Sequence, residues 1–183
     1  MMKNNILQTL TAALILAVVC TAGDLIWSYW QLPHKVVYGI THGGVMCLCI
    51  GAVLGVMAAG KRAGMIGAGL SLIAGSAISG GFYPLYSLLG TAAMFVCWML
   101  LWLAFAWIHR YLAKAGQSTR TTIIRGLVAS ILSGAAFYPI YELWANPPEQ
   151  SAWHLFLAAW FIAFLPGFGA LLIGTSSHPN TAA

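Results

Sequence analysis

Few side chains in this 183-residue chain could transfer protons or bind a metal ion. There are three acidic residues, and there are five histidines, whose imidazoles change charge near neutral pH. Asp24, His42, Glu142 and His154 lie near the ends of four apolar segments, and we expect those ends on one side of a membrane. At 1.5 Å per residue, all four would lie within about 10 Å of one interface. We therefore predict that these four side chains converge in one cavity.

Such a cavity would suit a small amphiphilic ligand. A carboxylate and an imidazole can hydrogen-bond a polar head, while aromatic side chains hold an apolar body. The favoured function is therefore the binding or translocation of a small amphiphilic or lipid-like ligand in the outer half of a helical bundle. The predicted aromatic wall of this pocket contains Tyr83, Tyr138, Trp27 and Trp144.

Two alternatives use the same residues differently. Histidine and carboxylate side chains bind zinc, iron or copper, and two histidines can hold a haem, so the chain could be an intramembrane metal- or haem-dependent enzyme. Alternatively, it is a small structural subunit of a larger membrane complex, whose glycine-rich and aromatic faces bind partner membrane subunits. Whether the protein is an enzyme stays open at this point, and the sequence identifies no cofactor.

No local motif identifies a reaction. The chain lacks H-E-x-x-H, the G-x-S-x-G elbow, a P-loop and a glycine-rich dinucleotide turn. Hydrolase and nucleotide-dependent functions therefore have no support, and no metal ligands are assigned. Cys47 and Cys49 would point about 200° apart on a helix, so they cannot share a metal ion. We interpret them, together with Cys20 and Cys97, as packing residues.

The composition is that of a membrane protein. The chain is 61% hydrophobic and 6% charged, and its mean hydropathy is +0.86. A soluble domain is about half apolar and about one quarter charged, so a lipid bilayer must cover the excess apolar surface. Disorder, a disulfide scaffold and a cytosolic enzyme are excluded. The net charge of +5 does not indicate a nucleic-acid partner, because the basic residues flank apolar segments.

Six segments are long enough to cross the hydrocarbon core, which takes about 20 residues. Short linkers join these segments, which predicts that successive helices are antiparallel neighbours in a compact bundle. The predicted fold is an all-α polytopic membrane protein with a single six-helix transmembrane domain over residues 1–183. The predicted helices are residues 6–27, 36–59, 65–86, 91–108, 123–144 and 153–173.

The distribution of basic residues predicts the orientation. Seven of the eight lysines and arginines would lie on one side of the membrane, and Lys35 would lie on the other. Because positive charge concentrates in cytoplasmic loops, both termini are predicted to be cytoplasmic, in a bacterial inner membrane. The first apolar segment continues to Trp27, beyond any cleavage site, so we interpret it as a retained helix surrounded by membrane lipids.

A five-residue motif occurs twice. Residues 82–86 read F-Y-P-L-Y, and residues 137–141, 55 positions later, read F-Y-P-I-Y. This predicts a parallel internal repeat of helical hairpins, in which the third and fourth helices match the fifth and sixth. Each motif proline would kink the outer end of its helix and widen an outer vestibule. On the sixth helix, residues 166–169 (P-G-F-G) are a candidate bend or gate.

Small residues recur on the second and third predicted helices. In lipid, they allow neighbouring helix backbones to approach closely. Close packing of each of these helices on its neighbours is therefore expected. The residues are Gly39, Gly43, Gly44, Gly51 and Gly55 on the second helix, and Gly64, Gly67, Gly69, Gly75, Gly80 and Gly81, with Ser71, Ser76 and Ser79, on the third.

The first helix contains an acidic residue, Asp24, and is followed by Leu32, Pro33, His34 and Lys35. In a chain of six spans with both ends inside, this region resembles the Insig-type sterol-linked membrane proteins and their bacterial relatives. The resemblance covers residues 24–35 and the topology. It implies a lipid-binding membrane protein, and no binding residue is carried over from it.

Overall fold

The computed structural model describes the backbone of residues 2–29, 35–114 and 117–172. The described residues are almost entirely helical, and six of the helices are long and apolar enough to cross a membrane, which confirms the all-α prediction. A short 3-10 helix, η1 (Gln150–Ala152), precedes the last of them. The helices are α1 (Met2–Tyr29), α2 (Lys35–Ala59), α3 (Lys61–Leu89), α4 (Ala92–Ala113), α5 (Thr119–Ala145) and α6 (Trp153–Leu172).

The helix ends differ from the predicted ones for identifiable reasons. The third helix extends to Lys61–Leu89 because it begins and ends at glycines with positive φ, Gly60 (83°) and Gly90 (56°). Helix α5 begins at Thr119 because the Ser118 hydroxyl accepts a hydrogen bond from the Thr121 backbone N–H (3.1 Å). Pro84 and Pro139 both lie inside helices, which continue past them.

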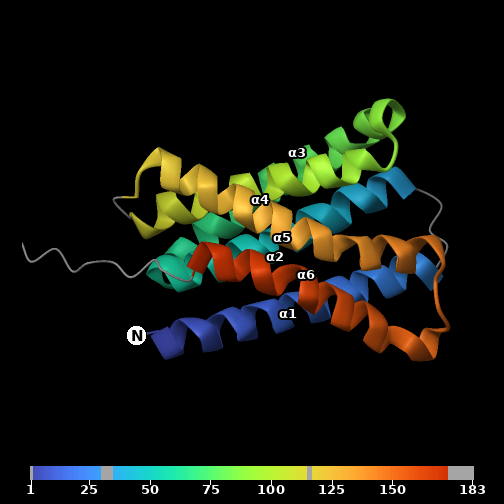
Figure 1. The fold of residues 1–183 in the computed structure, drawn as a ribbon, viewed down its shortest axis with the longest axis horizontal. Helices are drawn as coiled ribbons and strands as arrows, with labels where there is room; N and C mark the ends of the chain where they lie inside the picture. Colours follow the sequence, from blue (N-terminus) through green and yellow to red (C-terminus); the bar gives the residue numbers. More distant parts are fainter. Residues whose placement is uncertain (1, 30–34, 115–116, 173–183) are drawn as a thin grey trace, which may run out of the picture.

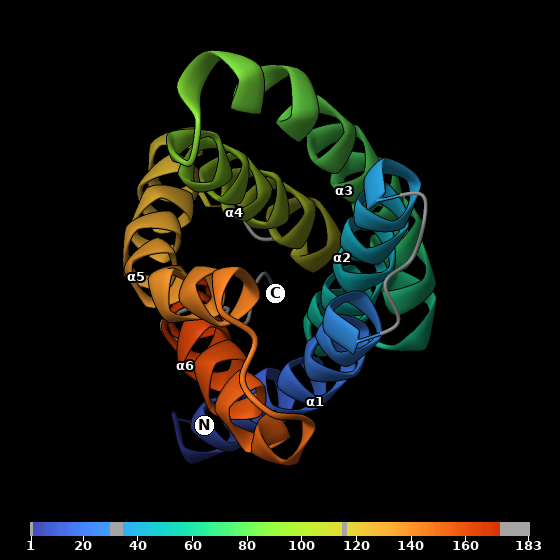
Figure 2. The ribbon, with the colours of Figure 1, turned by 90° about the vertical axis from the view of Figure 1, so that its right-hand side faces the viewer.

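The six helices form a closed ring in which successive helices run in opposite directions (Figures 1 and 2). Each helix contacts the next, and α1 closes the ring by packing along α6. Helix α1 packs much more extensively on α6 than on α2, its neighbour in sequence. The first and last helices therefore form one of the main seams of the bundle.

Aromatic side chains fill the centre of the bundle. The Trp98 ring lies 6.1 Å from both the Trp160 ring and the Phe164 ring, and Trp160 stacks on Phe164 at 5.3 Å. Gly167 on α6 lies against Trp102, where a Cβ would overlap the indole. This contact explains one glycine of the P-G-F-G segment by packing alone. The α6 helix continues past Pro166 to Leu172.

Polar side chains join helices within this core. The Trp98 indole on α4 donates a hydrogen bond to the Ser133 hydroxyl on α5 (3.0 Å). Ser133 in turn donates to the Ala163 carbonyl on α6 (2.5 Å). One serine thus links three helices, as expected where polar side chains cannot reach water.

Small residues form the interface between α2 and α3, as the sequence predicts. A Cβ added at Gly51 would overlap the Gly67 backbone carbonyl and the Ser71 hydroxyl, and one at Gly55 would overlap the Ala63 backbone. Backbone therefore lies directly against backbone along this pair. Helix α3 contributes small buried residues here and no fully buried large apolar side chain.

Large apolar side chains cover the outside of the bundle. On α3, for example, Met65 is 76% exposed and Ile73 is 70% exposed. Polar residues such as Asp24, Ser130 and Ser133 are meanwhile buried. This inverted arrangement is typical of a protein whose surroundings are apolar.

All but one of the lysines and arginines belong to one end of the bundle, and the exception, Lys35, begins α2 at the other end. Lys61 starts α3, Arg110 lies in the last turn of α4, and Arg120 lies in the first turn of α5. These residues share the end where α1, α3 and α5 begin, which we call the basic end. Asp24 and Glu142 lie near the opposite end, which we call the acidic end.

The α2–α3 contact leads to a stability prediction. Replacing Gly51 by alanine should lower the free energy of unfolding by about 1–3 kcal/mol, because the added methyl group has no space against the α3 backbone. Gly69→Ala is the matched control, since nothing lies within 4 Å of a Cβ at that position. Denaturant unfolding in mixed micelles, followed by circular dichroism, would measure both. Equal effects at the two glycines would contradict the tight α2–α3 contact.

Candidate functional site

Asp24 is the buried acidic residue of the described chain. It lies on the last part of α1 and is 1% exposed. One carboxylate oxygen accepts a hydrogen bond from the Trp160 indole N–H on α6. A carboxylate in an apolar bundle is costly unless donors satisfy it, so this bond is central to how α1 and α6 fit together.

His42 on α2 lies on the other side of Asp24. Its Nε2 is 3.7 Å from the second carboxylate oxygen, beyond direct hydrogen-bond distance. The imidazole packs on Gly23, where any Cβ would overlap the ring. Tyr38 stacks on His42 with ring centroids 5.8 Å apart and donates a hydrogen bond to the Gly23 carbonyl (2.5 Å). Gly23 therefore makes room for the approach of α2 to Asp24.

A second indole completes this arrangement. Trp144 on α5 packs 6.2 Å from the Trp160 ring and also interacts with the Asp24 side chain. Side chains from α1, α2, α5 and α6 thus meet at one buried carboxyl group. We call Asp24, His42, Trp144 and Trp160 the Asp24 cluster.

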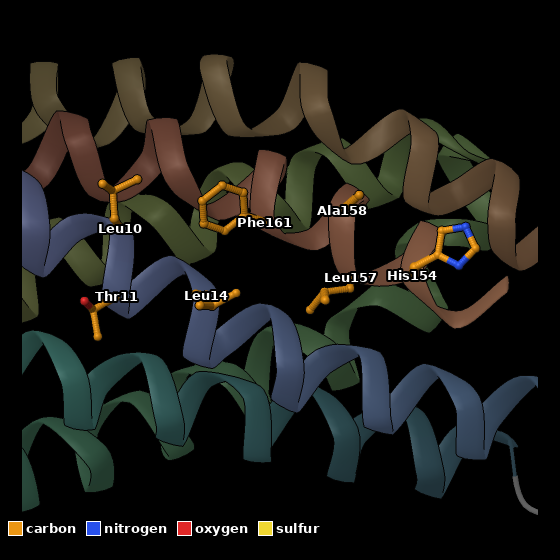
Figure 3. A pocket seen from close by; sticks show the side chains of 7 residues that line it. All are labelled: Leu10, Thr11, Leu14, His154, Leu157, Ala158 and Phe161. Carbon is orange, nitrogen blue, oxygen red and sulfur yellow. The ribbon is translucent and has the colours of Figure 1, made fainter. Parts of the chain in front are cut away.

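An open apolar groove runs between α1 and α6. Its volume is about 390 Å³, and side chains from both helices line it (Figure 3). His154 lies at the end of the groove nearest the acidic end, and the other lining residues extend toward the basic end. The α1 residues are Leu10, Thr11 and Leu14, and the α6 residues are His154, Leu157, Ala158 and Phe161.

A smaller and more enclosed pocket lies between the start of α4 and the end of α5. Its volume is about 200 Å³. We call it the aromatic pocket, because four aromatic residues and one carboxylate line it. They are Phe95, Trp98, Tyr138, Tyr141 and Glu142.

The structure brings together two of the four ionisable residues that were expected to converge. Asp24 and His42 lie in the Asp24 cluster. Glu142 is exposed in the aromatic pocket, and His154 is exposed in the α1–α6 groove. Glu142 and His154 line different hollows, and neither of these two hollows is lined by Asp24 or His42.

The expected aromatic residues are also divided. Trp144 joins the Asp24 cluster, and Tyr138 lines the aromatic pocket. Tyr83 instead packs on α2, where its hydroxyl donates to the Val36 carbonyl (3.3 Å) and lies against Gly39. The side chain of Trp27 lies outside the described residues.

Sequence reasoning missed residues whose role depends on the direction in which the side chain leaves the helix, and not only on its depth along the helix. Trp160 is a central apolar residue by pattern, yet it is the donor to Asp24. The depth of Trp160 on α6 could have indicated it. Ala158 and Thr11 carry no chemical signal, because they shape the groove by being small.

The side chains that could bind a metal ion are dispersed. Cys20, Cys47, Cys49 and Cys97 are all free thiols. Within the ranges that the structure describes, no group of three or more His, Cys, Asp or Glu side chains is placed to hold a metal ion.

The Asp24–Trp160 hydrogen bond can be tested by substitution. Trp160→Phe should cost about 1.5–3 kcal/mol more unfolding free energy than Trp102→Phe, because only the first change removes a donor to a buried carboxylate. Both tryptophans are about 1% exposed, so the loss of ring volume is matched. Denaturant unfolding in micelles would give the two values. If Trp102→Phe is as costly as Trp160→Phe, the hydrogen bond does not stabilise the α1–α6 seam.

Similarity to known proteins adds no information on these sites. The chain matches no protein-family model, no curated protein and no solved structure. Its function is therefore inferred from the residues and geometry described above.

Proposed function

We propose that the chain is an integral membrane protein that binds a single-chain amphiphile in the α1–α6 groove. The observation that carries this proposal is the groove itself, which is open, apolar and about 390 Å³ in volume, with one imidazole near one end. The tail of the amphiphile occupies the apolar part, and its polar head lies beside His154 at the acidic end.

Insertion in a membrane follows from the arrangement of polar and apolar groups. Six helices are long and apolar enough to span a bilayer, and exposed large apolar side chains occur on all of them. The concentration of lysine and arginine at the basic end supports a cytoplasmic location for both termini. A bacterial inner membrane is the proposed location, and the acidic end then faces away from the cytoplasm.

The shape of the groove favours an extended ligand. From His154 to Phe161 the groove follows about 10 Å of α6, at 1.5 Å per residue, and it continues beside Leu10 on α1. An extended hydrocarbon tail matches this open, lengthwise shape better than a compact ligand. The groove opens sideways, so the amphiphile enters from the bilayer.

The Asp24 cluster supports the groove without lining it. Asp24 lies on α1 and Trp160 lies on α6, and these two helices form the groove walls. Their hydrogen bond fixes the separation of the walls near the acidic end. Asp24, His42 and Trp144 are therefore positioning residues in this proposal, and they do not contact the ligand.

Photolabelling tests the proposed site. The probe is a palmitic acid analogue with a diazirine near its carboxyl end, added to the full chain in lipid nanodiscs, and labelled peptides are identified by mass spectrometry. Labelling should concentrate on α6 near His154. Ala158→Trp should reduce it by about tenfold, a loss of about 1.4 kcal/mol of binding free energy, because the indole fills the groove.

A matched control and a second probe make the result decisive. Ala77→Trp adds the same indole to an exposed position on α3 and should leave labelling unchanged. A probe with the diazirine near its methyl end should label the region of Leu10 instead. Labelling spread evenly over all exposed helices, or unaffected by Ala158→Trp, would rule out the groove as the binding site.

A further inference from the structure

The aromatic pocket has a composition that the proposed amphiphile site does not explain. It lies between α4 and α5, it shares no lining residue with the groove, and its single charged side chain is Glu142. Tyr138 and Tyr141 lie on the same helix as Glu142 and complete one wall. Phe95 and Trp98 on α4 supply the other wall.

We propose that the aromatic pocket binds an organic monocation, specifically a quaternary or tertiary ammonium group. Aromatic rings attract such cations through the negative charge of their faces, and desolvation strengthens the attraction. The Glu142 carboxylate supplies the opposite charge. A combination of several aromatic side chains and one acid is the standard chemical recognition of an alkylammonium ion.

The electrostatics of the pocket support a cation. No lysine, arginine or histidine lines it, and seven of the eight basic residues of the chain belong to the basic end, across the bundle. The start of α4 at the pocket disfavours a cation by its helix dipole, whereas the end of α5 at Ala145 favours one. These two partial charges oppose each other, so the full charge of Glu142 decides the sign.

The construction of the pocket walls also fits this ligand. Gly134 lets the Phe95 ring lie close to α5, since a Cβ there would be 2.6 Å from the ring. The Trp98 N–H is already used by Ser133, so Trp98 presents aromatic surface to the pocket instead of a donor. A volume of about 200 Å³ is below the usual size of a drug-binding site, of about 300 Å³ or more, and suits a small head group.

The test compares a cation with its neutral isostere. Choline and 3,3-dimethyl-1-butanol differ by a quaternary nitrogen in place of a carbon. Both would be titrated onto the full chain in phosphatidylglycerol nanodiscs, and binding would be measured by saturation-transfer NMR. Choline should bind about tenfold more tightly than the neutral isostere, as expected for a cation–π site with a carboxylate.

Substitutions identify the site. Glu142→Gln should weaken choline binding by about tenfold, and Tyr141→Leu should also weaken it. Glu149→Gln is the control, because Glu149 is an exposed acid at the same end that does not line the pocket. Circular dichroism melts would confirm that each variant remains folded.

A second arm separates the two sources of an ammonium group. The second arm uses mixed nanodiscs of constant phosphatidylglycerol content, because an anionic surface itself concentrates cations. When phosphatidylcholine replaces phosphatidylethanolamine as the second lipid, a weaker apparent affinity for choline would show that the lipid head group occupies the pocket. An unchanged affinity would identify a free cation as the ligand. Equal affinities for choline and its isostere, no effect of Glu142→Gln, or no saturable binding of choline would each overturn the proposal. None of these results depends on the α1–α6 groove.

Discussion

The hydrogen bond from the Trp160 indole to the buried Asp24 carboxylate is the constraint on which the rest of this structure depends. It joins the first helix to the last and so helps to close the ring of six helices. A carboxyl group at this depth has no access to water, and leaving it without a donor would cost several times the net value of an ordinary hydrogen bond. The fold must therefore bring α6 to α1, whatever the order of the helices in the sequence.

The helix interfaces differ in how they are held, and this difference places the proposed site. Helices α2 and α3 meet backbone to backbone through glycines such as Gly51 and Gly67, and such an interface leaves no space for a ligand. Helices α1 and α6 are joined by Asp24 and Trp160 near the acidic end, but along the rest of their length Thr11 and Ala158 are too small to fill the seam. A groove therefore opens beside the Asp24–Trp160 hydrogen bond, which joins its two walls near the acidic end.

Depth along a helix could be predicted from the sequence, whereas direction around the helix could not. Hydropathy located the six described helices that are long and apolar enough to cross a membrane, and Asp24 and His42, which have a similar depth on successive helices, lie near each other. Glu142 and His154 have a similar depth but point elsewhere. In a soluble helix, the polar face would reveal such directions, but in these helices nearly every position is apolar on all sides. The grooves and pockets are also formed by absent side chains, as at Ala158 and Gly134, which have no chemical signature.

The two copies of the F-Y-P-x-Y motif show how the same residues acquire different roles from their neighbours. Tyr83 in the first copy faces Gly39 on α2, and the absence of a side chain there lets its hydroxyl reach the Val36 carbonyl. Tyr138 in the second copy lies beside α4, where Gly134 and Phe95 form a hollow that the tyrosine borders but does not fill. Tyr83 is therefore used for packing, while Tyr138 is 64% exposed at the edge of the aromatic pocket. Similar local sequence thus fixes the position of a tyrosine on its helix, and the small residues around it decide whether that tyrosine packs against a neighbouring helix or borders a hollow.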